Sequence, residues 1–389
     1  MFIFGRATND PSGTSVIVPI VCIKDSVASH RFFRTLEKMN HSHSHDDAKA
    51  RILSNPTRPF DPVGATSATE ILTRMQGTAF QGKQLGLAFE VWKKMLGDKC
   101  TIMMGMSGAM VPAGMRRLVV RMIENRLIDC LVSTGANFFH DFHETMGFYH
   151  YQGHHATDDV LLAENLVDRM YDVLADEEKF REHDQWIGKF AGSLDQSRPY
   201  TTREFLHLLG LELGKHCKED GIVSAAAKAG VPLYCPAVAD SSIGIGIAAN
   251  RYEGGNKFTF DVIGDVVETA RIVAESHATG VIYFGGGTPK NFVQQTEVTA
   301  IIMNTGVTGH KYAVQCVTDA AHWGGLSGCT FEEAQSWGKI AKDASMVTCH
   351  SDSTIAMPIL VSALLEHPEL IANRHRPSFT MGRELGVKA

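Results

Sequence analysis

The chain has 389 residues, of which 44% are hydrophobic and 21% charged, with 43 acidic against 37 basic side chains. This length and apolar content are typical of a globular protein with one large or two medium domains. The net charge of -6 and the lack of a long basic run argue against a nucleic-acid partner, and the mild acidic excess favours a cationic ligand only weakly.

The eight cysteines are scattered along the chain and form no CxxC pair. Such cysteines are typical of reduced thiols in a cytoplasmic protein. The apolar stretch at residues 15–23 is interrupted by Pro19 and is too short to span a bilayer, and no basic segment typical of a secretion signal precedes it. We therefore expect a cytoplasmic protein without a membrane partner.

The first 50 residues show little of the pattern of a folded core. They include a His/Ser tract from His41 to Asp47, whose alternating histidines could bind metal but find their nearest partners only within the same stretch. A solvated tail or loop explains the tract better, and an arm that packs on another subunit is the alternative. We expect residues 1–50 to form an extension, disordered in part, and residues 51–389 to form one domain.

From about Pro59 the chain alternates between helical and strand-like apolar patterns. Predicted helices cover residues 68–75, 86–95, 115–125, 266–276 and 331–344, a helical middle covers 158–227, and a last helix starts at Pro358. Predicted strands cover residues 100–104, 127–132, 232–235, 258–263, 280–284, 312–317 and 346–349. This alternation predicts an α/β fold with a mainly parallel sheet flanked by helices.

In such sheets, ligands bind beyond the carboxyl ends of the strands. Gly285-Gly286-Gly287 directly follows the apolar run VIYF, and three glycines there allow backbone N–H groups to approach a phosphate. Glycine also serves any tight turn from strand to helix, and the spacing is not that of a G-x-G-x-x-G fingerprint. Residues 133–137 and Thr318-Asp319 occupy equivalent strand ends, where small and hydroxylated side chains suit a ligand crevice or cap a helix.

Lys339, in the segment QSWGKI, is the candidate nucleophile. A nucleophilic lysine must lose its proton, which requires a desolvated site or cationic neighbours. Trp337 could supply an apolar wall or a face for an ammonium substrate. A surface lysine on a helix is the alternative, because a regular helix would point Lys339 away from the face shared by Glu333 and Trp337. The capping box Thr330-x-x-Glu333 also accounts for Glu333 by itself.

Five histidines between residues 140 and 155 suggest a metal site. Their spacing matches no compact zinc pattern such as HExxH, and surface or hydrogen-bonded histidines explain them better. We therefore expect no metal.

The segment FEEAQSWGKI at residues 331–340 resembles the helix of deoxyhypusine synthase that carries its catalytic lysine. The resemblance covers nearly everything from about Pro59 to Leu365, with six blocks in the family's order and approximate spacing. The other five blocks are CTIMMGMSGAMVPAG, LIDCLVSTGAN, VPLYCPAVADSSIG, VIYFGGGTPKN and the YAV run before Thr318.

The resemblance implies an NAD-dependent enzyme with a Rossmann-like fold, so that residues 51–389 would form one NAD-binding catalytic domain. It also implies a homotetramer with active sites at subunit interfaces. Family members oxidise a secondary amine such as spermidine, pass hydride to NAD and transfer the aminobutyl part through an imine on the lysine. The acceptor is a lysine of the hypusine-bearing translation factor, or putrescine in homospermidine-forming relatives. A small amine or polyamine-like substrate and a protein lysine acceptor are therefore the expected partners.

Carried onto this sequence, the resemblance makes Lys339 the imine-forming residue, with Trp337 and Glu333 lining the amine site. Asp319 follows Thr318 at the same strand end, and we predict that it also contacts the nucleotide. The other predicted nucleotide contacts are Gly108, Ala109, Met110, Thr134, Gly135, Ala136, Asp240, Gly285, Gly286, Gly287, Thr318, Asp352 and Ser353.

The sequence departs from the family at five positions of the amine site. Its two adjacent glutamates are Phe139 and His140 here, two aspartates are Ile245 and Leu326, and a histidine is Asn291. Most of the acidic clamp for a polyamine is therefore replaced. Because a buried ammonium without a partner costs several kcal/mol, we expect ordinary spermidine binding to be lost. His140 and Asn291 are predicted to contact the substrate in place of the family's residues.

Three functions stay open. The first is a family enzyme with an altered donor that carries fewer charges, or a guanidinium, or a carboxylate that His140 could pair with. The second is an orthodox deoxyhypusine or homospermidine synthase in which Asp141 or Glu144 compensates for the missing carboxylates. The third is a non-catalytic paralogue that assembles with an active synthase, although the retained Lys339 argues against it.

Overall fold

The computed structural model describes residues 45–388 of the chain, which falls into two compact units, residues 1–57 and 58–389. In the first unit, the described residues include helix α2 (His45–Ile52). Residues 1–44 lie outside the described residues, and they hold most of the predicted extension and the start of the His/Ser tract. The interpretation of residues 1–50 as a tail or an arm therefore stays a prediction.

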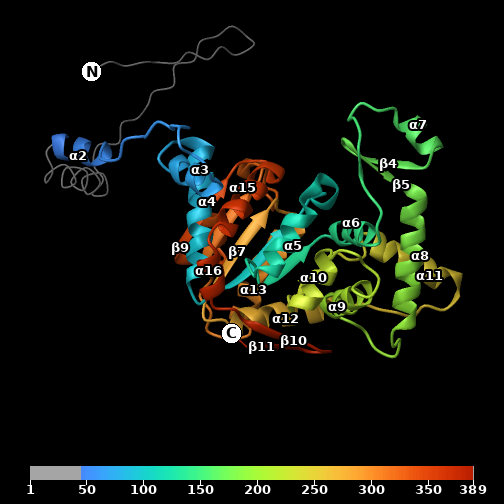
Figure 1. Cartoon of the computed structure of the whole chain (residues 1–389). Coiled ribbons are helices and arrows are strands. Elements are labelled where there is room, and N and C mark those ends of the chain that lie inside the picture. The colour runs from blue at the N-terminus through green and yellow to red at the C-terminus, as the bar shows by residue number, and fades with distance from the viewer. Residues whose placement is uncertain (1–44, 389) are drawn as a thin grey trace, which may run out of the picture. The chain divides into compact units, whose positions relative to one another are not determined.

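The second unit is built on a six-stranded sheet of order β6-β2-β1-β7-β8-β9, in which every neighbouring pair is parallel (Figure 1). The strands are β1 (Thr101–Met106), β2 (Cys130–Ser133), β6 (Leu233–Tyr234), β7 (Thr279–Phe284), β8 (His310–Cys316) and β9 (Ile340–Cys349). Both β1 and β7 are buried along their whole length, as expected for a parallel sheet covered on both faces. The predicted α/β fold with a Rossmann-like, mainly parallel sheet is confirmed.

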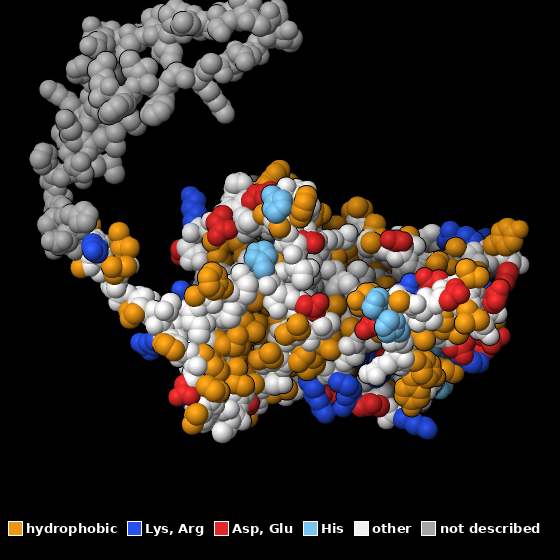
Figure 2. Space-filling view, turned by 90° about the horizontal axis from the view of Figure 1, so that it is seen from above, with side chains coloured by type: hydrophobic (Ala, Val, Ile, Leu, Met, Phe, Trp, Pro, Cys, Tyr) orange, Lys and Arg blue, Asp and Glu red, His pale blue; other side chains and the backbone are white. Residues whose placement is uncertain are grey.

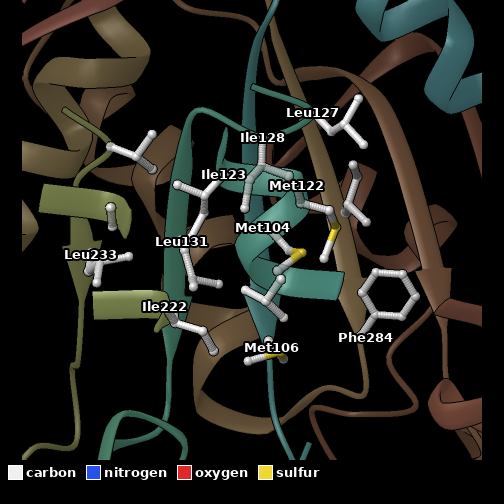
Figure 3. Packing of buried hydrophobic residues seen from close by; sticks show 14 of the residues in the cluster. Met104, Met106, Met122, Ile123, Leu127, Ile128, Leu131, Ile222, Leu233 and Phe284 are labelled. Atoms are coloured by element: carbon white, nitrogen blue, oxygen red, sulfur yellow. The ribbon is translucent and has the colours of Figure 1, made fainter. Parts of the chain in front are cut away.

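Helices cover both faces of this sheet, and alternate residues of β1 point to opposite layers. Met104 and Met106 belong to the cluster formed with α4, α5 and α15, whereas Met103 belongs to the cluster formed with α12 and α13. Figure 3 shows the first cluster, in which Met104 lies beside Met122 of α5. The helices are α4 (Phe80–Gly97), α5 (Arg116–Glu124), α12 (Val262–Glu275), α13 (Gly287–Ile302) and α15 (Ser353–Leu365).

A second, three-stranded antiparallel sheet of order β3-β5-β4 stands apart from the main sheet (Figure 1). Its segment comprises α6 (Gly135–Thr145), β3 (Tyr151–Gln152), α7 (Asp159–Glu164), β4 (Val167–Met170), β5 (Val173–Asp176) and α8 (Glu177–Ser193). The remaining elements of this unit are α3 (Ala68–Met75), η1 (Val111–Met115), α9 (Thr202–Leu213), α10 (Ile222–Ala229), α11 (Ser242–Gly254), η2 (Ala321–Trp323), α14 (Phe331–Ser336), α16 (Pro368–Asn373), β10 (Ser378–Met381) and β11 (Leu385–Lys388).

The predicted helix over residues 331–344 is wrong in its second half. Helix α14 ends with Trp337 as its C-cap, and Gly338 turns the chain in the left-handed region at φ 71°. A glycine adopts this conformation without the steric cost of a Cβ, so it ends the helix there. The chain then enters β9, six residues earlier than the predicted strand at 346–349.

Two further expectations are wrong. Residues 258–263 form no strand, because Phe258 and Phe260 pack against Phe205 and the segment makes only an isolated bridge between Phe260 and Tyr200. The predicted helical middle over 158–227 contains the strands β4 and β5, which pair across a turn with Tyr171 at φ 57°.

Candidate functional site

The loops predicted to contact the nucleotide lie together at one edge of the main sheet. Because all six strands are parallel, their carboxyl ends meet at that edge, where ligands of such sheets bind. β7 points upward in Figure 1, so Figure 2, which is seen from above, looks onto this side of the molecule. The loops are residues 107–110 after β1, 134–136 after β2, 236–241 after β6, 285–287 after β7, 317–319 after β8 and 350–353 after β9.

The glycines after β7 allow three loops to approach one another. A Cβ at Gly285 would lie 2.3 Å from Ser107 Oγ, and a Cβ at Gly286 would lie 2.3 Å from the Cα of Ser327. The backbone N–H of Gly286 donates to Ser107 Oγ at 2.8 Å, and that of Gly287 donates to Ser327 Oγ at 3.0 Å. These N–H groups therefore already have protein partners, and a phosphate here would compete with two serine hydroxyls.

The loops after β1 and β2 are joined by Asn137, a residue that the sequence did not single out. Its side-chain oxygen accepts from the N–H groups of Met110 and Val111 at 3.1 and 3.3 Å, and its Nδ2 donates to the Gly108 carbonyl at 2.9 Å. Thr134 caps α6 with its hydroxyl. The predicted nucleotide contacts on the two loops are thus held in one arrangement by a buried amide, which the STGAN motif already contains.

Asp352 caps α15, and its carboxylate accepts from the N–H and the hydroxyl of Thr354 at 2.7 and 2.6 Å. Asp352, Asp240, Thr318 and Asp319 are all exposed. Capping accounts for Asp352 as a structural residue, whereas the other three side chains are open to a ligand.

Lys339 lies just beyond the end of α14 and is 7% exposed. Its Nζ donates to Asn291 Oδ1 at 3.2 Å and lies 5.5 Å from the centre of the Trp337 ring. The turn at Gly338 is what directs this side chain inward, where a regular helix would have pointed it elsewhere. Lys339 therefore differs from a surface lysine on a helix, and it contacts two of its predicted partners.

A second buried lysine, Lys290, lies close to Lys339 and was missed at the sequence level. It is 1% exposed, and its Nζ donates to Gln315 Oε1 at 2.9 Å and to the carbonyls of Ser327 and Cys329 at 3.3 and 2.6 Å. Burial lowers the pKa of Lys290 to about 8, and the nearby charge of Lys339 acts in the same direction. Its place in the block VIYFGGGTPKN was the available signal.

Glu333 completes this group. It is exposed on α14, and its backbone N–H is capped by Thr330 Oγ1 at 3.1 Å. Its carboxylate lies close enough to raise the pKa of Lys290, against the larger effect of burial, and it helps burial to raise the pKa of the Cys329 thiol. The structure thus brings Lys339, Asn291, Trp337 and Glu333 together within one chain.

Within residues 45–388, no group of three or more His, Cys, Asp or Glu side chains is arranged to hold a metal ion. No helix in the same range is long and apolar enough to cross a bilayer.

Comparison with known proteins identifies the family. A family model described as deoxyhypusine synthase matches residues 70–364, a range that contains every predicted site residue. The chain belongs to the deoxyhypusine synthase family. It is 51% identical over 315 residues to "Probable deoxyhypusine synthase 2" of Methanosarcina acetivorans, covering 80% of this chain and 90% of that protein. To "Probable deoxyhypusine synthase 1" of the same organism it is 37% identical over 320 residues, covering 82% and 97%.

A solved structure shares the fold. A candidate deoxyhypusine synthase from Entamoeba histolytica superimposes with a TM-score of 0.53 at 18% identity, covering 79% of this chain and 96% of that one. At this identity the likeness supports the architecture alone.

The five positions predicted to depart from the family's amine site lie in two places. Asn291 and the exposed Leu326 belong to the segments around Lys339. Phe139 and His140 lie on α6 after β2, and Ile245 lies on α11, which contacts α6. Strand β2 is four positions from β9 in the sheet, about 19 Å at the usual spacing of neighbouring strands. Within one chain, His140 is therefore far from Lys339.

His140 and Phe139 are buried between α6 and α8. His140 is 9% exposed, and its Nδ1 lies 3.0 Å from His150 Nε2, while His150 Nδ1 lies 2.7 Å from Glu144 Oε1. Burial lowers the pKa of His140 to about 3, with a further effect of the neighbouring histidines. Phe139 packs edge-on against Phe180 at 5.2 Å. His140 is thus neutral and held in a hydrogen-bonded row that ends at a carboxylate.

The two carboxylates proposed to compensate for the missing clamp are both engaged. Asp141 is fully buried and accepts from Arg116 Nε at 2.9 Å and from the N–H groups of Ile222 and Val223 at 2.7 and 2.9 Å. Glu144 is paired with His150 and lies 3.7 Å from Arg116. Neither carboxylate is free to hold an ammonium group without losing these partners.

Proposed function

We propose that the protein is an NAD-dependent transferase that moves an aminoalkyl group of aminobutyl type from an amine donor, through an imine on Lys339, to an acceptor amine. The observation that carries this proposal is the buried Lys339 with Asn291, Trp337 and Lys290 around it. Asn291 and Lys290 lie on α13, the helix that begins at the predicted nucleotide loop after β7. Membership of the deoxyhypusine synthase family gives the reaction class.

The residues at the carboxyl edge of the main sheet suit a dinucleotide. Gly287 has a positive φ and open space where a Cβ would point, and Asp240 and Asp319 are exposed carboxylates of the kind that bind ribose hydroxyls. When bound there, NAD supplies the acceptor and later the donor of hydride. The loops of this chain would position the nicotinamide against the amine carbon and exclude water.

Lys339 has to attack as a neutral amine. Its side chain is withdrawn from solvent, and its Nζ lies 3.2 Å from Asn291 Oδ1. Its attack on the oxidised donor forms the C–N bond to Lys339 and expels the remainder of the donor as an amine. The acceptor amine then displaces Lys339 from the imine, and hydride reduces the new C=N bond.

We propose that the donor carries fewer cationic groups than spermidine. The Glu333 carboxylate lies close enough to raise the pKa of Lys290. Ile245 and Leu326, at positions where the family has aspartates, are apolar and 57% and 49% exposed. Trp337, 64% exposed, offers a face for one cation or an apolar chain.

We further propose a homotetramer in which a second subunit completes each site. The predicted substrate contact His140 lies about 19 Å from the strand that follows Lys339. Trp323, Leu326 and Ile355 are large apolar side chains that stay exposed in the segments that follow β8 and β9. Figure 2 shows hydrophobic side chains gathered in patches on this side, as expected for a surface that another subunit covers.

Borohydride trapping tests the proposal. The protein is incubated with NAD and, in turn, spermidine, homospermidine, putrescine and agmatine, then reduced and digested for mass spectrometry. We expect an adduct on Lys339 with at least one amine, whose mass identifies the transferred group. Lys339→Ala abolishes the adduct, and the matched control Lys342→Ala, which changes an exposed lysine on the strand that follows Lys339, preserves it.

Absence of any adduct in protein that demonstrably binds NAD would overturn the transferase proposal in favour of the non-catalytic paralogue. An adduct from spermidine as efficient as from any other amine would overturn the altered donor alone.

A further inference from the structure

Two buried cysteines face each other at the carboxyl ends of the last two strands. Cys316 ends β8 and Cys349 ends β9, and the two residues are direct partners in the parallel register. They are 0% and 1% exposed, and their thiols are hydrogen-bonded to each other. The chemistry proposed for Lys339 uses neither of them.

The backbone geometry at this pair suits a disulfide. Neighbouring strands lie about 4.8 Å apart, within the range of roughly 4.4–6.8 Å between Cα atoms that a disulfide requires. Both side chains belong to the same hydrophobic cluster, on the face of the sheet covered by α4 and α15, so they point to the same side. Oxidation would therefore need little movement of either strand.

The two thiols differ in acidity in the direction that disulfide formation requires. The hydrogen bond from Cys316 lowers the pKa of Cys349, whereas the same bond and burial raise the pKa of Cys316. Cys349 is accordingly the thiol that ionises first and reacts as the nucleophile. Cys316 is the neighbour that resolves the product.

The cover over Cys349 is the first turn of α4. Cys349 Sγ contacts the Gln81 carbonyl at 3.6 Å, and the Gln81 side chain accepts from the His350 N–H at 2.6 Å. The preceding Phe80 is 89% exposed at φ 55°, and Ala79 gives this helix no side-chain cap. An uncapped turn that starts on a strained residue opens at low cost, which gives small oxidants a route to the thiol.

We propose that Cys316 and Cys349 form a peroxide-sensitive disulfide site that clamps both ends of the segment carrying Lys339. The Cys349 thiolate attacks one oxygen of the peroxide and becomes a sulfenic acid, and the released hydroxide takes up a proton to give water. Cys316 then attacks the sulfenic sulfur, so that a second water leaves as the S–S bond forms. The two thiols lose two electrons in total and the peroxide gains them.

The clamp acts on loops that already meet at this pair. The Val317 N–H donates to the Cys349 carbonyl at 3.1 Å, and the Gly285 N–H donates to the Cys316 carbonyl at 2.9 Å. The disulfide would close residues 316–349 into a covalent loop that contains α14, Gly338 and Lys339. Restricting the opening of this loop requires no assumption about the reaction at Lys339, so the inference stands apart from the proposed function.

The test uses the full chain in its native state, titrated with hydrogen peroxide, quenched with an alkylating agent and mapped by mass spectrometry without reduction. We expect a Cys316–Cys349 linked peptide at peroxide concentrations that leave Cys235 reduced, since burial raises the pKa of Cys235 and it serves as the internal control. Hydrogen exchange of residues 317–339 should slow several-fold in the oxidised protein.

Two variants separate the roles of the thiols. In Cys316→Ser, Cys349 should stop at the sulfenic acid and be trapped by dimedone, whereas in Cys349→Ser, Cys316 should stay reduced. A linked peptide that appears only after denaturation, or oxidation of the pair no faster than of Cys235, would overturn the proposal. Unchanged exchange in residues 317–339 despite complete linkage would overturn the clamp.

Discussion

Lys290 and Lys339 are both buried, yet their ammonium groups are held in different ways. Lys290 directs its three N–H bonds to three acceptors, whereas Lys339 has one hydrogen-bond partner, Asn291. Breaking three hydrogen bonds costs more than breaking one, so Lys290 is held in place more firmly than Lys339. Lys290 is therefore suited to structure and local charge, and Lys339 to covalent chemistry.

Replacing Lys290 tests how much this residue contributes to the stability of the fold. Lys290→Met leaves the Cys329 carbonyl without its partner, so we expect the free energy of unfolding to fall by about 2 kcal/mol. Urea unfolding followed by circular dichroism measures this change. The control Lys311→Met removes an exposed ion pair with Asp98 and should cost at most about 0.5 kcal/mol. Equal losses in the two variants would contradict a special role for Lys290.

At the scale of elements, the short helix α14 positions the candidate nucleophile by ending where it does. Gly338, at φ 71°, is the residue that separates α14 from β9 and places Lys339 in the interior. Helical periodicity could not predict this, because the apolar pattern continues through QSWGKI and only the glycine interrupts it. The error in the predicted helix 331–344 and the inability to group Glu333, Trp337 and Lys339 have this one cause.

Gly338→Ala should therefore affect stability and chemistry together. A Cβ in the left-handed region costs about 1 kcal/mol, and relief of this strain would displace Lys339. We expect a destabilisation of that size in urea and a reduced yield of trapped Lys339 adduct. Gly325→Ala, at a glycine without positive φ and with open space for a Cβ, is the control and should change neither quantity. A normal adduct yield in Gly338→Ala would show that Lys339 tolerates the displacement.

The contact between α6 and α8 holds a row of hydrogen-bonded histidines. His143 Nδ1 lies 3.1 Å from His183 Nδ1, and His140 pairs with His150. Burial lowers the pKa of His140 to about 3 and that of His143 and His183 to about 4 each. The neighbouring histidines add to this effect at His140 and His143. No local sequence pattern could predict this row, because His183 comes from a helix 40 residues further along the chain.

This row predicts acid sensitivity. Between the ordinary histidine pKa of 6.5 and the lowered folded values, the unfolded state binds more protons, so stability falls as pH decreases from 6.5 toward 4. One pH unit below 6.5, each of the three histidines should cost about 1 kcal/mol relative to pH 7.5. Urea unfolding at pH 7.5 and 5.5 measures the difference.

Variants identify the histidines responsible for that difference. His183→Phe should reduce it, while His155→Gln, which changes an exposed histidine, should leave it intact. A difference that persists unchanged in His183→Phe would assign the acid sensitivity to other groups.

At the scale of the whole molecule, the sequence predicted the parallel sheet. It did not predict which of the candidate site residues lie close together within one chain. Apolar runs separated by helical patterns indicate parallel strands, and parallel strands bring Gly108, Thr134, Asp240, Gly285 and Thr318 to one edge. The order of strands in the sheet is a long-range property, and it alone separates α6 from Lys339. The burial of His140 and Asp141, which removes both from easy contact with a ligand, likewise depends on partners distant in the sequence.

The proposed assembly is testable through the exposed apolar side chains at the carboxyl edge. We expect wild-type protein to elute as a tetramer in size-exclusion chromatography with light scattering, and Leu326→Glu to shift it to smaller species, because burying an unpaired charge costs several kcal/mol. Ile302→Glu changes an apolar side chain of higher exposure at the end of α13 and should preserve the tetramer. A monomeric wild type would contradict the assembly.

The order of the strands also describes how the molecule can grow as it is synthesised. The first strand of this sheet to be made, β1, lies inside it. β2 and then β6 extend the sheet on one side of β1. β7 pairs with β1 on the other side, and β8 and β9 are then added in turn. Such a sheet can fold outward from its interior strand during synthesis of the chain. The strand that follows Lys339 is the last of this sheet to be made, so the loops after β1, β2, β6, β7 and β8 are synthesised before the strand that follows the lysine.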